Sequence, residues 1–267
     1  MKEIVHIIPL GHEIDRAVRT FDNYKANRAY ILATTDDTKY NPEMIKKQVY
    51  YLNAVKDVLN SRGISTIVIN VDMFDLQEVI KTVSQIVVKE KIEDNEVFVN
   101  VSSSGRLTSI GATLSAMANG AQAYYVEADD YSITREEKHK HGLSICTDLK
   151  IRFLTSFKFK MPKENGIKIL VKLLETPSNE LKPWKAIEYL AKEGSPDWKE
   201  YSNFQSRNFD RSKKQRGLMK LNKGVLTELQ KNGYITRGSL GRYKTIRITD
   251  SGKHIACLSG LTTEKFH

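Results

Sequence analysis

Two short loops carry the residues of this chain that could bind an anion. The first follows an apolar segment, and its candidate residues are Gly11, His12, Asp15 and Arg16. The second follows another apolar segment, and its candidates are Asn100, Ser102, Ser103, Ser104, Gly105, Arg106 and Thr108. Small hydroxyl residues and a glycine let backbone N–H groups approach an anion at the start of a helix. Arg106 could add a bidentate contact to a phosphate.

Neither loop matches a common nucleotide-binding fingerprint. Gly11 stands outside any GxGxxG pattern, and Ser103-Ser104-Gly105-Arg106 lacks the spacing and the Lys-Ser/Thr pair of a Walker A loop. The residues therefore argue against ordinary dinucleotide or ATP binding. The alternative for the second loop is a serine-capped helix start, in which Ser102 or Ser103 satisfies free N–H groups. Among helix starts of this composition, capping is the commoner role.

Other polar clusters give weaker signals. His139 and His141 stand two residues apart among lysines, without a carboxylate or cysteine at ligand spacing, which favours an exposed loop over a metal site. The pairs Asp36-Asp37 and Asp129-Asp130 could coordinate Mg²⁺ but are more typical of turns after strands. Since no catalytic triad is recognisable, we predict no catalytic residue, metal ligand or cofactor.

The two loops sit within a regular alternation of elements. Strand-like β-branched runs occupy residues 3–9, 28–34, 64–71, 96–101 and 122–127, and helix-like stretches occupy residues 12–25, 42–62, 75–91 and 106–119. This alternation predicts an α/β fold with a Rossmann-like, doubly wound, mostly parallel sheet. Residues 151–160 alternate in polarity and suit an edge strand or an interface hairpin. Ligands bind beyond the carboxyl ends of such strands, where both loops fall.

Charge divides the chain into two domains. Of 42 Lys+Arg and 32 Asp+Glu, residues 1–162 hold 21 of each, so the whole formal charge of +10 lies in residues 163–267. Pro162 and Gly166 interrupt the pattern at the same place, which predicts domains at 1–162 and 163–267. A segregated basic domain attracts polyanions and favours nucleic acid as a partner, the alternative being a solvated basic surface.

The basic domain has the element order of a winged helix-turn-helix. Helix patterns at 167–175, 181–193 and 212–232 precede two short strands around a glycine-rich turn, while residues 195–210 show no clear period. The third helix carries an apolar stripe of Leu218, Leu221, Val225 and Leu229. We predict DNA contacts off that stripe from Lys213, Gln215, Arg216, Lys220 and Lys223, and from the wing through Arg237, Arg242, Lys244 and Arg247.

The cysteines, the N-terminal residues and the hydrophobicity of the chain indicate in which cellular compartment we expect the protein. Cys146 and Cys257 lie far apart and form no CxxC spacing, so neither a disulfide framework nor a zinc finger is indicated. No apolar run approaches the roughly 18 residues that would span a bilayer, and the first residues run directly into a strand-like segment. We therefore expect a soluble protein of the reducing cytoplasm, without a membrane partner.

Three segments resemble archaeal regulators that fuse a CRISPR-associated Rossmann fold (CARF) domain to a winged helix-turn-helix. They are VHIIPLGHEIDRAVRTF, VNVSSSGRLTSIGATLSAMA and NGYITRGSLGRYKTIRITDSGK, and the resemblance covers essentially the whole chain in the same domain order. The second loop is similar to the CARF phosphate loop through Asn100, Ser102, Ser104, Gly105 and Arg106. Ser103 is an additional small residue that departs from the common spacing.

The resemblance implies a homodimer that binds a symmetric anionic ligand between its two Rossmann-like domains. In CARF relatives that ligand is a cyclic oligoadenylate, most often cyclic tetra-adenylate, and the setting is CRISPR-based antiviral defence. The implied function is a ligand-responsive, dimeric regulator of transcription that binds double-stranded DNA. Two alternatives stay open: a ring nuclease or other hydrolase that cleaves the cyclic nucleotide, and an adaptor that binds duplex RNA.

Overall fold

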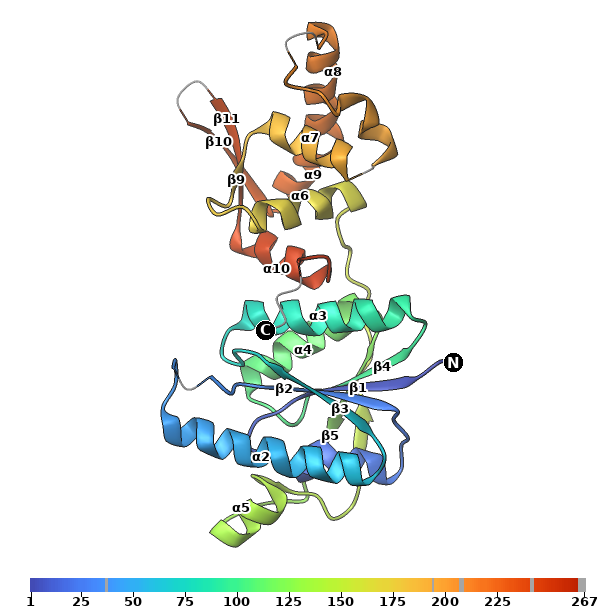
Figure 1. Ribbon diagram of the computed structural model, residues 1–267, viewed down its shortest axis with the longest axis vertical. Coiled ribbons are helices and arrows are strands. Elements are labelled where there is room, and N and C mark those ends of the chain that lie inside the picture. The colour runs from blue at the N-terminus through green and yellow to red at the C-terminus, as the bar shows by residue number, and fades with distance from the viewer. Residues whose placement is uncertain (37, 194, 207–208, 241–242, 264–267) are drawn as a thin grey trace. The chain divides into compact units, whose positions relative to one another are not determined.

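The structure is a computed structural model that describes residues 1–36, 38–193, 195–206, 209–240 and 243–263. It contains two compact units, residues 1–159 and residues 160–263, called unit 1 and unit 2 below (Figure 1). The division falls close to the boundary predicted at residue 162. None of the helices in these described ranges combines the length and hydrophobicity needed to cross a membrane.

Unit 1 is built on a six-stranded sheet in the order β3-β2-β1-β4-β5-β8. The strands are β1 (Ile4–Pro9), β2 (Arg28–Ala33), β3 (Ser65–Asn70), β4 (Glu96–Asn100), β5 (Gln122–Val126) and β8 (Ile151–Phe153). All neighbouring pairs are parallel except β5 and β8. The predicted doubly wound, mostly parallel fold is confirmed. Because the chain grows outward from β1 in both directions, strand order reverses between β1 and β4.

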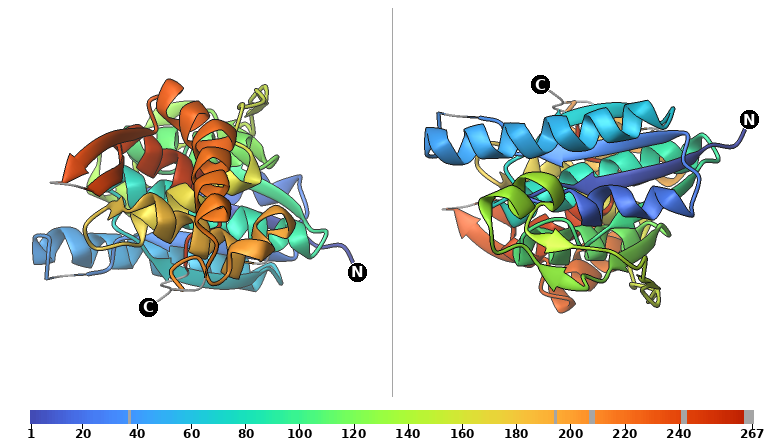
Figure 2. Two further views of the ribbon diagram at one scale, coloured as in Figure 1. Left: turned by 90° about the horizontal axis from the view of Figure 1, so that it is seen from above. Right: turned by 90° about the horizontal axis from the view of Figure 1, so that it is seen from below.

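Helices cover both faces of this sheet (Figures 1 and 2). They are α1 (Asp15–Val18) with the 3₁₀ turn η1 (Arg19–Asp22), α2 (Pro42–Ser61), α3 (Leu76–Ile92) and α4 (Arg106–Ala118). Successive strand residues point to opposite faces. Ile7 of β1 accordingly packs in one core with Val83 of α3, whereas Ile8 packs in the other core with Val55 of α2. Burial on both faces explains why the central strands β1 and β2 are apolar at nearly every position, whereas Ile67 and Val68 of the edge strand β3 are exposed.

The segment around His139 and His141 differs from its prediction. It forms helix α5 (Arg135–His141), not an exposed loop, between the paired strands β6 (Asp130–Tyr131) and β7 (Ser144–Ile145). A capping box explains the helix, because Thr134 accepts from the backbone of Glu137 while the Glu137 carboxylate accepts from the backbone of Thr134. The predicted extended segment at 151–160 is a strand only at Ile151–Phe153, on the sheet edge.

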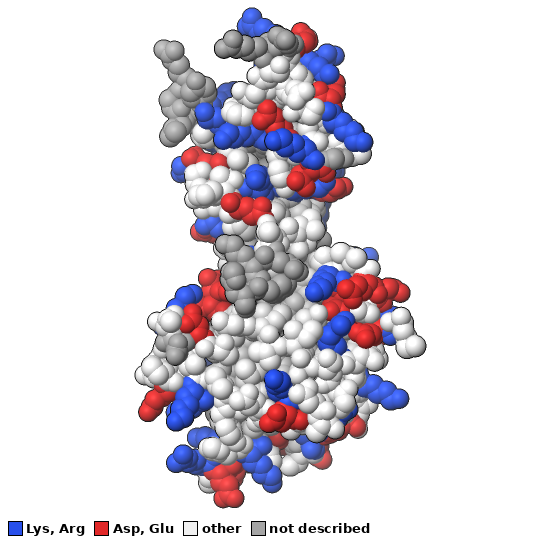
Figure 3. Space-filling view, in the orientation of Figure 1, with Lys and Arg blue, Asp and Glu red and all other residues white. Residues whose placement is uncertain are grey.

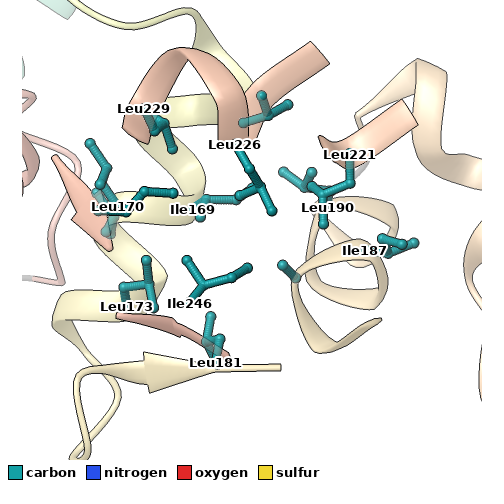
Figure 4. Packing of buried hydrophobic residues seen from close by; sticks show 14 of the residues in the cluster. Ile169, Leu170, Leu173, Leu181, Ile187, Leu190, Leu221, Leu226, Leu229 and Ile246 are labelled. Carbon is teal, nitrogen blue, oxygen red and sulfur yellow. The ribbon is translucent and has the colours of Figure 1, made fainter. Parts of the chain in front are cut away.

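Unit 2 is a winged helix, as predicted. Its helices are α6 (Glu164–Leu174), α7 (Pro183–Lys192), α8 (Arg211–Leu221), a π turn η3 (Asn222–Leu226), α9 (Thr227–Lys231) and α10 (Asp250–Leu258). The wing is the hairpin of β10 (Ile235–Leu240) and β11 (Tyr243–Ile248), and β9 (Glu180–Leu181) pairs with β11. Figure 4 shows its core, in which Ile169, Leu190 and Leu221 meet Ile246 of the wing.

The segment between α7 and α8, which has no clear sequence period, is part of this core. It contains the 3₁₀ turn η2 (Pro196–Tyr201), and Trp198, Tyr201 and Phe204 are all buried. These rings pack on α8 at Gly217, where an added Cβ would lie 2.8 Å from Tyr201 Cε1. The predicted apolar stripe is therefore wrong at Leu218, which is 40% exposed, because the aromatic segment covers the adjacent face at Gly217 instead.

Candidate functional site

The two predicted loops are bonded to each other where strand order reverses. The backbone N–H of Gly11 donates to the carbonyl oxygen of Ser103 at 2.7 Å, and the Ser103 hydroxyl donates to the carbonyl oxygen of Pro9 at 2.8 Å. Both bonds are buried or nearly so. They join the ends of β1 and β4 into one platform at the topological switch point, the usual place for a ligand in such a sheet.

Three of the predicted binding residues hold this platform from within. Asn100 is fully buried, donates to the backbone oxygen of Arg16 at 2.8 Å and accepts from the N–H and hydroxyl of Ser102. Thr108 donates to the backbone oxygen of Met73 at 2.6 Å, and Ser103 bonds as described above. Because buried polar groups need such partners, these side chains position the loops.

The start of α4 carries no side-chain cap. Its first residue is Arg106, and Gly105 at the cap position makes no side-chain hydrogen bond. Ser102 and Ser103 direct their hydroxyls to Asn100 and Pro9, so the alternative of a serine-capped helix start is wrong. The first N–H groups of α4 thus keep their capacity to bind an anion.

Two carboxylates of the first loop tie it to the β6–α5–β7 segment. Asp15 accepts from His141 Nδ1 and from the backbone N–H of Cys146, both at 2.9 Å. Glu13 accepts from the N–H of Ser144 and, at 2.7 Å, from its hydroxyl. Burial raises the pKa of Glu13 above its ordinary value. Asp15, predicted as a ligand contact, is therefore engaged within the protein and positions the loop.

Two pockets flank the turn from Ser104 to Arg106. The first, called the α2-side pocket, has a volume of about 340 Å³ and is lined by Gly11, His12, Met44, Gln48, Met73, Phe74, Gly105, Thr108 and others. The second, called the α4-side pocket, has a volume of about 630 Å³ and is lined by Arg16, Ser102, Ile110, Tyr125, Tyr131 and others. Ser104 and Arg106 border both pockets, so a ligand bound at this turn could extend into either.

Arg106 and Arg16 border the pockets, and Arg16 also pairs with Glu13 at 3.8 Å. Arg106 is exposed at the start of α4. The Arg16 guanidinium lies 5.3 Å from the centre of the Tyr125 ring and 3.4 Å from the Ser102 carbonyl oxygen. Burial and the nearby Lys47 lower the pKa of His12, which stacks on Tyr51, so that His12 is neutral at pH 7. Two guanidinium groups beside free helix amides favour an anionic ligand.

Gln48 is a polar residue of the α2-side pocket that sequence reasoning missed. Gln48 donates through Nε2 to the carbonyl oxygens of Leu10 at 2.9 Å and Gly11 at 3.4 Å. Because carbonyl oxygens only accept hydrogen bonds, the Gln48 side chain must direct its nitrogen toward both of them. Its side-chain oxygen therefore stays available as an acceptor. A sequence signal existed, because Gln48 interrupts the buried stripe of α2 formed by Ile45, Leu52 and Val55.

The residues predicted to bind DNA fall into two groups on α8 and the following π turn η3, which contains Lys223. Gln215, Arg216 and Lys223 are exposed and form no hydrogen bond or ion pair with another described residue. Lys213 instead pairs with Glu200 at 3.1 Å, and Lys220 donates to the backbone oxygen of Asp197 at 2.6 Å while lying over the Trp198 ring. The two lysines thus attach α8 to the aromatic segment.

The predicted DNA-binding residues of the wing also include both bonded and exposed side chains. Arg237 donates to the side chains of Asn222 and Thr227, and Arg247 pairs with Glu180 at 3.0 Å. Lys244 is exposed, whereas Arg242 lies outside the described residues. Figure 3 shows a band of Lys and Arg side chains across the part of unit 2 that contains α7, with acidic side chains among them. Positive surface in unit 2 therefore extends beyond α8.

Comparison with protein families assigns both halves of the chain. Residues 4–131 match the HFX_2341_N-like N-terminal domain, and residues 165–260 match the DUF6293 C-terminal winged helix domain. Residues 4–131 are therefore similar to an HFX_2341_N-like domain, and residues 165–260 are similar to a DUF6293 winged helix domain. The predicted combination of a Rossmann-like domain with a winged helix is confirmed in its fold and domain order. A search of curated proteins finds no match.

The solved structures that are similar to this chain are distant. Csm6 of Enterococcus italicus, bound to cyclic hexa-2′-fluoro-hexa-dAMP, is 14% identical with a TM-score of 0.45 over 86% of this chain. Can2 of Sulfobacillus thermosulfidooxidans, in complex with cyclic tetra-adenylate, is 11% identical with a TM-score of 0.39 over 95% of this chain. The chain spans 58% and 62% of those two chains. At TM-scores below 0.5, these similarities carry no argument about function.

Replacing Ser103 by alanine should loosen the platform. The change removes the buried hydrogen bond to Pro9, which stabilises a typical fold by about 1 kcal/mol. We expect the free energy of unfolding to fall by about that amount, and amide exchange at Gly11 to become faster. The matched control is Ser104→Ala, since Ser104 bonds only to the Ser109 hydroxyl at 3.3 Å, and its stability should change by less than about 0.5 kcal/mol. Equal effects of the two substitutions would contradict this role of Ser103.

Proposed function

We propose that this chain is a dimeric DNA-binding transcription regulator of a CRISPR system, controlled by a cyclic oligoadenylate bound at the crevice of unit 1. The observation that carries the proposal is the uncapped start of α4 beside Arg106 and Arg16, in the same chain as a winged helix. An anion site at a switch point suits a phosphorylated ligand, and a winged helix with free basic and amide side chains suits DNA. The sequence resemblance to CARF regulators names the ligand class.

The shape of the crevice supports a nucleotide with its base in the α2-side pocket. Met44, Met73 and Phe74 give that pocket apolar walls against which a flat ring can pack. The free acceptor oxygen of Gln48 suits the exocyclic amino group of adenine and would be left facing a carbonyl oxygen of uracil. The phosphates would then lie at Ser104, Gly105 and Arg106, which border the pocket.

Exposed apolar side chains around the pockets support a homodimer. Leu107 and Ile110 on α4 and Tyr131 and Ile133 on the β6–α5 segment are 45%, 54%, 64% and 83% exposed. Apolar groups clustered on one surface mark an interaction site more often than a free surface. A second copy related by a two-fold axis would cover them and bring a second Arg106 to the same ligand, giving a symmetric site for a cyclic molecule.

Replacing Arg106 by alanine should weaken ligand binding without changing the fold, because Arg106 is exposed. Loss of one charge-assisted contact of about 1.5–3 kcal/mol predicts an affinity about 10- to 150-fold lower. Calorimetric titration with cyclic tetra-adenylate measures this, and Arg135→Ala, at an exposed arginine of α5, is the control expected to bind normally. Failure of the wild-type protein to bind any cyclic oligoadenylate would refute the sensor, and a linear product would identify a nuclease instead.

Replacing Arg216 by alanine should weaken binding to duplex DNA. Arg216 is exposed on α8 and unbonded among the described residues, so a phosphate contact would be lost while the fold is kept. The slope of log affinity against log salt should become shallower by about one. Lys253→Ala in α10, where Lys253 pairs with Asp250, is the control expected to retain the wild-type slope. An unchanged affinity and slope in Arg216→Ala would exclude α8 as the DNA-binding helix.

A further inference from the structure

One face of α8 carries apolar side chains that the core of unit 2 does not use. Gln215, Leu218, Met219 and Asn222 follow each other at helical spacing and are exposed, beside the buried face of Gly217 and Leu221. Leu218 is 40% exposed and Met219 is 50% exposed. We call these four residues the α8 stripe. Two large apolar side chains exposed to water at the centre of a strongly basic helix indicate a binding surface for a partner.

The basic residues around the α8 stripe indicate that this partner is negatively charged. Arg211, Arg216 and Lys223 are exposed beside it and form no ion pair or hydrogen bond with the described part of the chain. Two other lysines of α8 are bonded within unit 2: Lys213 pairs with Glu200, and Lys214 donates to the backbone oxygen of Ser206 at 3.2 Å. An apolar pair framed by unpaired cations suits a polyanion that also offers apolar groups, and not an uncharged protein surface.

A hydrogen bond from the wing holds Asn222, the last residue of the α8 stripe, in the π turn. Asn222 accepts a hydrogen bond from Arg237 of β10, which also donates to Thr227 at 3.4 Å. Figure 1 shows α8 and the wing hairpin reaching the same end of unit 2, away from α10. The stripe is therefore presented on a helix held from both sides, by the aromatic segment and by the wing, as a base-reading helix must be.

We propose that Leu218 and Met219 contact the 5-methyl groups of thymine in the major groove, so that α8 selects A·T pairs. This inference rests on the proposed function of DNA binding and adds the bases that are read. Thymine is the base whose major-groove edge carries a methyl group, and its partner adenine offers N6 and N7 to an amide such as that of Gln215. Gln215 and Met219 lie about one helical turn apart on the stripe, roughly 6 Å along the helix axis, which is close to the length of two base-pair steps.

The test compares two duplexes that differ only in methyl groups. The wild-type protein first selects a duplex from a random library, and its affinity is then measured for that duplex and for the same duplex with deoxyuridine in place of thymidine. Every hydrogen-bonding group is retained, so a loss of about fourfold for each contacted methyl group is expected. The double variant Leu218→Ala/Met219→Ala should bind the thymidine duplex more weakly and should bind the two duplexes equally.

A matched control and the opposing outcomes separate this inference from the proposed function. Leu261→Ala removes an exposed apolar side chain of the same unit, 53% exposed and after α10, and should keep the wild-type preference for thymidine. Equal binding of both duplexes by the wild-type protein would overturn methyl recognition while leaving DNA binding intact. If no duplex is enriched from the library, both the inference and the proposed DNA binding are wrong.

Discussion

The hydrogen bonds between the two crevice loops are the constraint on which unit 1 depends. A bond from Gly11 to Ser103 and a bond from Ser103 to Pro9 hold the ends of β1 and β4 together, and Asn100 fixes Ser102 beside them. With these polar groups consumed inside the protein, the start of α4 is left uncapped and faces the pockets. The side chains most typical of a phosphate loop thus build the site, while backbone N–H groups and the two arginines border the pockets.

In unit 2 as well, some of the predicted binding residues support the structure and others stay exposed. The aromatic segment of Trp198, Tyr201 and Phe204 packs on α8 at Gly217, and Lys213 and Lys220 bind its polar groups. Basic residues on that side therefore stabilise the position of the helix, and those on the other side stay free for a partner. Counting lysines on a helical wheel would treat both sides alike. Which cations are available depends on what packs against the helix.

Sequence patterns predicted the fold well because the first five strands of the sheet are short, mostly apolar runs that alternate with helix-like stretches, and each crevice loop lies at a strand end. They located the crevice for the same reason, since strand order alone places both loops at the switch point. They could not separate Asn100 and Ser103, which support the site, from Arg106, which faces it, because residue type does not reveal the partner. Leu218 was assigned to the core for a similar reason, as helical spacing allows either Leu218 or Gly217 to face inward.

The proposed function requires the ligand crevice of unit 1 and the helix α8 of unit 2 to regulate each other within one protein. Ligand can change DNA affinity only by favouring one of two arrangements of the dimer, and the coupling must then be reciprocal. The direct measurement is the affinity of the wild-type protein for cyclic tetra-adenylate with and without its selected duplex, alongside its affinity for that duplex with and without the ligand. If the two sites are coupled, DNA changes the affinity for the ligand and the ligand changes the affinity for DNA by the same factor, about 5- to 150-fold. Ligand binding that DNA leaves unchanged would contradict it.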